Sequence, residues 1–178
     1  MITRLLIILL AFSSLPVGQN NENLIPWNSE KRLNWEDFKG NPPAEATNAA
    51  LTSSSIIINF TYSNESLRYQ VSCAFDKNRS WGRIKNDHIL AHEQGHFDIT
   101  ELHARKLFKN LKEYQFRRHT VSKDINLIYN KVVQDLQEMQ SGYDNETDHS
   151  RNFAAQKEWQ SKIAEELAMS KNYADYGK

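Results

Sequence analysis

The chain of 178 residues lacks several features that would indicate common classes of protein. It has one cysteine, Cys73, so an intramolecular disulfide is impossible and a cysteine-based structural zinc site has no partners. Its 22 basic and 22 acidic residues give a formal net charge of zero, so there is no basic field to bind nucleic acid or anionic lipid. No internal repeat or low-complexity tract is evident. The length suits one domain with a real hydrophobic core.

Long apolar runs are also scarce, and the one at the N-terminus is short. Arg4 supplies a positive charge, residues 5–12 are apolar, and small residues follow up to Gly18. Such a run is typical of a secretory signal peptide, because a membrane-spanning helix needs about 20 apolar residues. We predict a signal peptide over residues 1–18 and a mature domain over residues 19–178. The mature protein is expected in the periplasm or outside the cell, without a membrane anchor.

The mature sequence has a strand-rich first half and a helical second half. Polar and apolar side chains alternate over residues 55–62 and 67–75, and the turn between them predicts a β-hairpin. After Trp81 the apolar residues follow helical spacing. We expect three helices, over residues 84–111, 121–140 and 148–169. This order predicts an α+β fold in which a small antiparallel sheet precedes a helical half.

The first predicted helix carries His92-Glu93-Gln94-Gly95-His96, which fits the HExxH pattern of zinc hydrolases. Residues four apart share one side of a helix, so His92 and His96 can present two imidazole nitrogens to one metal ion. A catalytic zinc site takes three protein ligands and keeps one position for water. Glu93 can reach that water and accept its proton as a catalytic general base. A solvent-facing helix with incidental histidines is the alternative, but histidines that interrupt an apolar stripe favour a metal site.

The pattern does not give the third zinc ligand, because no residue just after His96 fits. We predict that His149 is this ligand, since it begins the third predicted helix on the stripe that faces the core. Glu146 is the next alternative, because a glutamate is a common third ligand of zinc. Glu101 comes after it.

Other polar residues are predicted to surround the ligands. Gln156 and Asp144 are placed to orient an imidazole from outside the ligand set. Tyr143 is a catalytic candidate because its hydroxyl could donate a hydrogen bond to a developing oxyanion, and a packed tyrosine is the alternative. His88 and His119 are expected to be peripheral.

The stretch from Leu90 to Leu102 resembles a bacterial family labelled as predicted secreted zinc-dependent proteases, which is catalogued mainly as a domain of unknown function. Further similar patches are Leu33–Gly40, Ser80-Trp81 and Tyr143–His149, with Gln156 and Trp159 at the family's spacing. The resemblance covers about residues 25–165. It implies zinc binding and, as the activity inferred for that family, proteolysis.

We therefore expect a secreted or periplasmic zinc peptidase that uses a metal-activated water and Glu93 to hydrolyse a peptide or protein substrate. Zincin peptidases often place a small sheet before the HExxH helix, and an edge strand can hold an extended peptide. One alternative is a secreted metal-binding or scaffold protein without turnover, and another is a hydrolase of a non-peptide amide such as a cell-wall cross-link. Loss of hydrolysis in Glu93→Gln with zinc retained would distinguish a peptidase from the metal-binding protein. The sequence does not indicate an oligomeric state.

Overall fold

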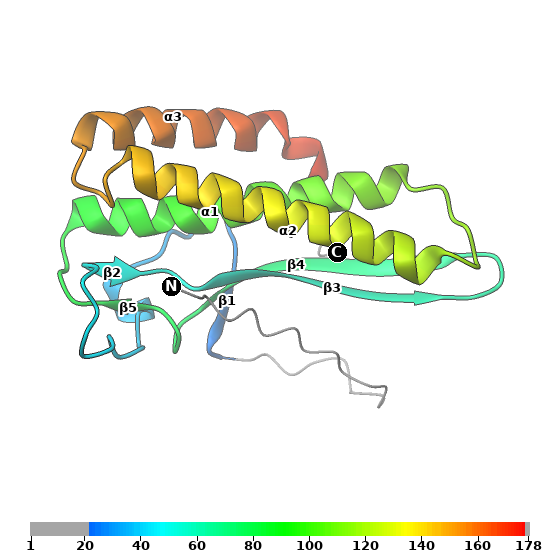
Figure 1. Cartoon of the computed structure of the whole chain (residues 1–178), viewed down its shortest axis with the longest axis horizontal. Helices are drawn as coiled ribbons and strands as arrows, with labels where there is room; N and C mark the ends of the chain where they lie inside the picture. The colour runs from blue at the N-terminus through cyan, green and yellow to red at the C-terminus, as the bar shows by residue number, and fades with distance from the viewer. Residues whose placement is uncertain (1–21, 177–178) are drawn as a thin grey trace.

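The computed structural model describes residues 22–176, and Figure 1 shows how their elements are arranged. The strands are β1 (Leu24–Pro26), β2 (Ala50–Leu51), β3 (Ser54–Tyr62), β4 (Leu67–Asp76) and β5 (Trp81–Gly82). The α-helices are α1 (Asp87–Glu113), α2 (Val121–Glu146) and α3 (Phe153–Met169), and the 3₁₀ helices are η1 (Trp35–Asp37) and η2 (Lys171–Tyr173). The predicted α+β order, with a small antiparallel sheet before the helices, is therefore confirmed.

The predicted signal peptide lies outside the described residues. Within residues 22–176, no helix combines the length and the apolar character needed to span a membrane.

The sheet is built on the predicted hairpin. Strands β3 and β4 pair antiparallel, with Ile56 opposite Cys73, and β1 pairs with the other side of β4. Strand β3 is therefore an edge strand of the described sheet. The inward face of the hairpin carries Ile56, Val71, Cys73 and Phe75, which are buried. Burial raises the pKa of the Cys73 thiol well above its ordinary value, so this cysteine is a packed apolar side chain rather than a nucleophile.

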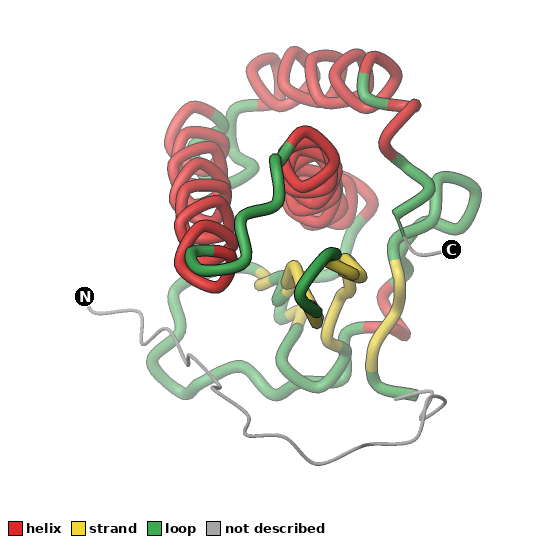
Figure 2. Tube along the Cα trace, turned by 90° about the vertical axis from the view of Figure 1, so that its right-hand side faces the viewer, coloured by secondary structure: helices red, strands yellow, loops and turns green. Residues whose placement is uncertain are grey.

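Helix α1 lies in the middle of the molecule. It begins after Asn86, whose side chain accepts a hydrogen bond from the backbone N–H of Ile89 at 2.9 Å. Seen end-on, α1 has the sheet on one side and α2 and α3 on others (Figure 2). Its polar residues at positions 92–94, 98, 101 and 103 are consequently buried along with its apolar ones. Each buried polar group on α1 needs a partner, and this requirement determines what surrounds the helix.

The junction between α2 and α3 differs from the sequence-based prediction. Helix α2 continues to Glu146, beyond the predicted end at residue 140, and α3 begins at Phe153 rather than at residue 148. The intervening turn contains Asp148, His149 and Ser150, whose φ angles are 48°, 51° and 73°. Left-handed backbone costs a residue with a side chain on the order of 1 kcal/mol or more. Neighbouring contacts must therefore hold this turn.

Glycine at position 95 allows α1 and α2 to come close together. A Cβ atom on Gly95 would lie 2.5 Å from the hydroxyl oxygen of Tyr143 and 2.8 Å from its Cζ. The Tyr143 side chain is fully buried, and its ring stacks on that of His92 with centroids 4.5 Å apart. The glycine inside the HExxH pattern thus makes room for the tyrosine that packs against the first histidine.

We expect Gly95→Ala to lower the thermal unfolding midpoint by several degrees. Overpacking a tight site costs about 1–3 kcal/mol, and each kcal/mol shifts the midpoint of a chain of this size by about 2–4 °C. Gly142→Ala on α2 is the matched control, because the nearest atom to its Cβ would be Cζ2 of Trp159 at 3.9 Å. The control should be neutral or stabilising, since alanine is favoured over glycine in a helix by about 0.5–1 kcal/mol. Circular dichroism melts compare the two, and a raised midpoint for Gly95→Ala would contradict the close contact.

Candidate metal centre

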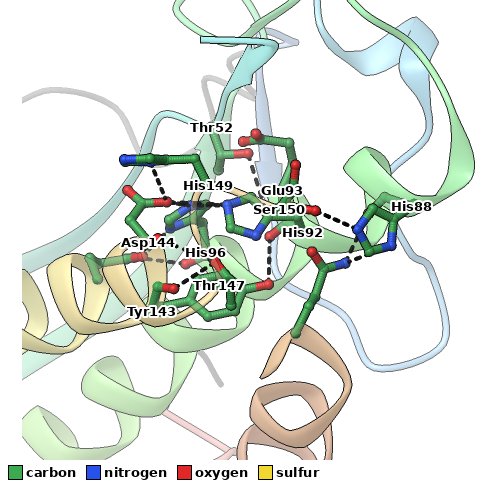
Figure 3. A network of polar contacts seen from close by, with 12 residues as sticks. Thr52, His88, His92, Glu93, His96, Tyr143, Asp144, Thr147, His149 and Ser150 are labelled. Atoms are coloured by element: carbon green, nitrogen blue, oxygen red, sulfur yellow. Dashed lines mark hydrogen bonds and ion pairs between the residues drawn. The ribbon is translucent and has the colours of Figure 1, made fainter. Parts of the chain in front are cut away.

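Three side chains from two helices meet at one point (Figure 3). The Nε2 atoms of His92 and His96 on α1 lie 3.2 Å apart. The Oδ1 atom of Asp144 on α2 lies 3.2 Å from Nε2 of His92 and 3.1 Å from Nε2 of His96. Within the described part of the chain, these residues form the group of three that could hold a metal ion.

The spacing of these atoms fits a tetrahedral metal ion. Ligand atoms about 2.0–2.1 Å from a zinc ion at tetrahedral angles lie about 3.3 Å from one another. The separations of 3.1 and 3.2 Å are close to that value. Two imidazoles and one carboxylate also form a donor set that suits zinc and leaves one position open.

Gln140 on α2 determines which nitrogen of His96 is available. Its side-chain amide donates to the backbone carbonyl of His96 at 2.9 Å and to the hydroxyl of Thr100 at 3.2 Å. Its carbonyl oxygen therefore accepts the proton of Nδ1 of His96. The lone pair on Nε2 then faces Oδ1 of Asp144 at 3.1 Å. Two acceptors at this distance are stabilised by a cation between them.

The charges around the histidines also favour a cation. Burial would raise the pKa of Asp144, but contacts with His92 and His96 outweigh it and lower that pKa below its ordinary value. Burial likewise would lower the pKa of His96, but Asp144, with a further contribution from Glu93, raises it above its ordinary value. Both shifts have the same cause, which is the attraction between the Asp144 carboxylate and the imidazoles that it contacts, and Glu93 adds a second negative charge beside His96.

Glu93 adds a carboxylate next to this group. Its side chain is buried, and Oε2 has no hydrogen-bond partner among the residues that the structure describes. Its backbone carbonyl accepts a hydrogen bond from the hydroxyl of Thr52 at 3.1 Å, which ties α1 to the segment before β3. A buried carboxylate oxygen without a protein partner is energetically unfavourable, so it marks a place where a ligand or a water would bind.

Tyr143 packs against the histidines. Its ring lies flat on His92 and edge-on to His96, with centroid distances of 4.5 and 5.0 Å. Its hydroxyl donates to the backbone carbonyl of His92 at 3.3 Å, and burial raises the pKa of that hydroxyl above its ordinary value. These contacts favour the alternative of a packed tyrosine that orients both imidazoles, and its catalytic role stays a prediction.

His149 lies beside the site but not where helical spacing predicts it. It belongs to the turn between α2 and α3, and its side chain is 54% exposed. Its Nδ1 atom is 3.5 Å from Oδ1 of Asp144. The expected inward orientation on α3 is wrong because α3 begins four residues later. Its role as a metal ligand stays a prediction.

The two glutamates proposed as alternative ligands make other contacts. Oε2 of Glu146 accepts a hydrogen bond from Nε1 of Trp159 at 2.8 Å. Glu101 is paired with Arg105 at 2.7 Å and also accepts a hydrogen bond from the hydroxyl of Tyr176. Neither carboxylate belongs to the group that meets at His92.

Sequence reasoning placed Asp144 outside the ligand set and assigned no role to Gln140. The reason is that the predicted second helix ends at residue 140. In the structure α2 continues to Glu146, so Gln140 and Asp144 both lie on this helix. Because they are four residues apart, they share one face of it. This spacing matches that of His92 and His96 on α1. A pair of polar residues four positions apart on each of two helices is the sequence pattern that could have indicated this site.

We expect Gln140→Leu to weaken zinc binding about 10–100-fold, as is usual when a group that orients a ligand imidazole is lost. Gln134→Leu on the same helix is the control, because that side chain is exposed and, among residues 22–176, bonds to Glu138 alone. Competition with a chromophoric chelator measures both affinities. Equal affinities would show that Gln140 does not control the state of His96.

Comparison with known proteins finds a family but no characterised relative. No curated protein and no solved structure matches the chain. A family model described as "Bacterial protein of unknown function (DUF922)" matches residues 13–150. The match contains β1 to β5, α1 and α2, and so includes all three side chains of the candidate metal centre. The chain belongs to this bacterial family, DUF922.

Proposed function

We propose that the protein is a secreted or periplasmic zinc-dependent peptidase in which His92, His96 and Asp144 hold the metal ion. The observation that supports this most strongly is the meeting of Nε2, Nε2 and Oδ1 at 3.1–3.2 Å beside the carboxylate of Glu93. A bound zinc ion would supply Lewis-acid chemistry, lowering the pKa of a water and polarising a carbonyl.

Glu93 is the general base in this proposal. Its buried Oε2 has no partner among the described residues and can accept the proton of the attacking water. The same carboxyl then donates that proton to the leaving amine. His92 is almost fully buried, whereas the side chain of Asp144 is 34% exposed. A substrate therefore approaches from the side of Asp144.

The edge strand supports a peptide as the substrate. The hydroxyl of Ser54, at the start of β3, lies 2.7 Å from that of Thr100 on α1. Thr52, just before β3, bonds to the carbonyl of Glu93. The beginning of the edge strand is thus fixed beside the HExxH helix. An extended peptide can add by main-chain hydrogen bonds to the beginning of this edge, before the carbonyl of Ile56 accepts a hydrogen bond from the hydroxyl of Tyr129, and so lie close to the metal centre.

Export is part of the proposal and is based on the apolar run of residues 5–12. Cleavage after about residue 18 would leave every residue of the proposed site in the mature protein.

We expect about one zinc ion per chain in the purified mature protein and a loss of affinity of at least about tenfold in Asp144→Asn. Glu146→Gln is the matched control on the same helix and should keep its zinc. Elemental analysis after dialysis measures the zinc content, competition with a chelator measures the affinity, and circular dichroism confirms that each variant is folded. If His149→Gln loses zinc while Asp144→Asn keeps it, His149 is the third ligand instead.

We expect Glu93→Gln to retain zinc but to cleave unfolded casein at least about 100-fold more slowly, because general acid–base catalysis contributes about 10²–10⁴-fold. Glu113→Gln, at the exposed end of α1, is the control and should cleave as the wild type does. Mass spectrometry of the released peptides measures the rates. Equal cleavage by the wild type and Glu93→Gln would contradict the assignment. Zinc binding without any cleavage by the wild type would favour a metal-binding protein.

A further inference from the structure

The turn between α2 and α3 adopts a conformation that its sequence does not favour. Asp148, His149 and Ser150 have φ angles of 48°, 51° and 73°, and none of them is glycine. The backbone N–H of His149 donates to the carbonyl of Asp144 at 2.8 Å. The shape of the turn is therefore coupled to the end of α2 that carries Asp144. A series of left-handed residues persists only where its surroundings hold it.

His88 on α1 supplies that support. Its Nε2 atom lies 2.6 Å from the backbone carbonyl oxygen of Ser150. Its ring stacks on Phe153, the first residue of α3, with centroids 3.7 Å apart and planes inclined by 8°. The turn is thus held by one hydrogen bond and one ring contact from the same side chain.

Gln156 on α3 determines the state of the His88 ring. Its side-chain amide donates to the backbone carbonyl of His88 at 3.0 Å and lies 3.4 Å from Nδ1 of that ring. Nδ1 is therefore the acceptor, and Nε2 carries the proton that is donated to Ser150. Gln156 therefore orients the imidazole of His88, which is not one of the proposed ligands.

Helix α1 carries histidines at positions 88, 92 and 96, which are spaced about one helical turn apart. The second and third face Asp144, and the first holds the turn that follows Asp144 (Figure 3). One helix thus fixes two proposed ligands directly and supports the backbone next to the third.

We propose that His88 is a positioning residue of the metal centre, which acts by donating its Nε2 proton to the carbonyl of Ser150. This hydrogen bond holds the left-handed turn and so keeps Asp144 and His149 in place. The effect on the metal rests on the function proposed above, whereas the effect on the turn does not.

Two substitutions separate the hydrogen bond from the ring contact. His88→Gln keeps an amide donor that can reach Ser150 but loses the ring. His88→Phe keeps a ring that can stack on Phe153 but loses the donor. His119→Phe is the control, because residue 119 is exposed in the connection between α1 and α2.

Three measurements on the full mature protein determine how each substitution affects the metal centre and the turn. Chelator competition gives the zinc affinity, and the visible spectrum of the cobalt(II)-loaded protein reports the coordination geometry. Hydrogen exchange measures the protection of the backbone amides of His149 and Asn152, which donate to Asp144 and Thr147. The exchange measurement does not require a metal.

We expect His88→Phe to bind zinc about tenfold more weakly, to change the cobalt spectrum and to lose protection at both amides. His88→Gln should stay within about twofold of the wild type, as should the control. The proposal is overturned if His88→Phe behaves as the wild type, or if His88→Gln is impaired as much as His88→Phe or more. If the wild type binds neither zinc nor cobalt, the proposed function fails, and the amide exchange alone decides whether His88 holds the turn.

Discussion

Burial of the polar side chains of α1 is the constraint on which the other contacts of the molecule depend. Asp98 accepts hydrogen bonds from Trp27 and Gln94 and is paired with Arg32, and these contacts bring the N-terminal segment onto the helix. Glu101 is satisfied by Arg105 and by Tyr176 near the C-terminus. Arg32 thus ties the N-terminal segment to α1 by charge, whereas the hydroxyl of Tyr176 ties the C-terminal end of the described chain to α1 by a hydrogen bond.

The same constraint distinguishes the candidate metal centre from the rest of the helix. Among the described residues, the buried side-chain atoms of α1 without a hydrogen-bond partner are Nδ1 of His92 and Oε2 of Glu93. The other buried side-chain nitrogen and oxygen atoms of α1 have a hydrogen-bond partner in the described part of the protein, but these two atoms at neighbouring positions do not. Natural proteins leave few buried polar atoms unpaired, and such atoms are expected where a ligand completes the site. The unpaired Oε2 of Glu93 supports a ligand at the centre by its burial alone, whereas Nδ1 of His92 is the ring nitrogen opposite the one that faces Asp144.

The geometry of the centre results from how closely α1 and α2 pack. Gly95 lets Tyr143 lie against the first histidine, and this contact places Gln140 and Asp144 opposite His96. The two helices therefore share one site, in which α1 provides imidazoles and α2 provides the carboxylate and the group that fixes a tautomer. A change in the packing of the helices would move the proposed ligands relative to one another, so packing and metal binding are coupled.

The sequence by itself determined the hairpin, the long α1 helix, the order of sheet and helices, and the pairing of His92 with His96. These features are local, because alternation and helical spacing act over a few residues. Only the tertiary structure decided that Asp144 and Gln140 lie against His96, that His149 stays partly exposed, and that His88 contacts the backbone carbonyl of Ser150. These outcomes depend on where α2 ends and on left-handed backbone at Asp148–Ser150, which no glycine indicates in the sequence. Contacts between α1, α2 and α3 stabilise that backbone, so its conformation is a property of the assembled fold.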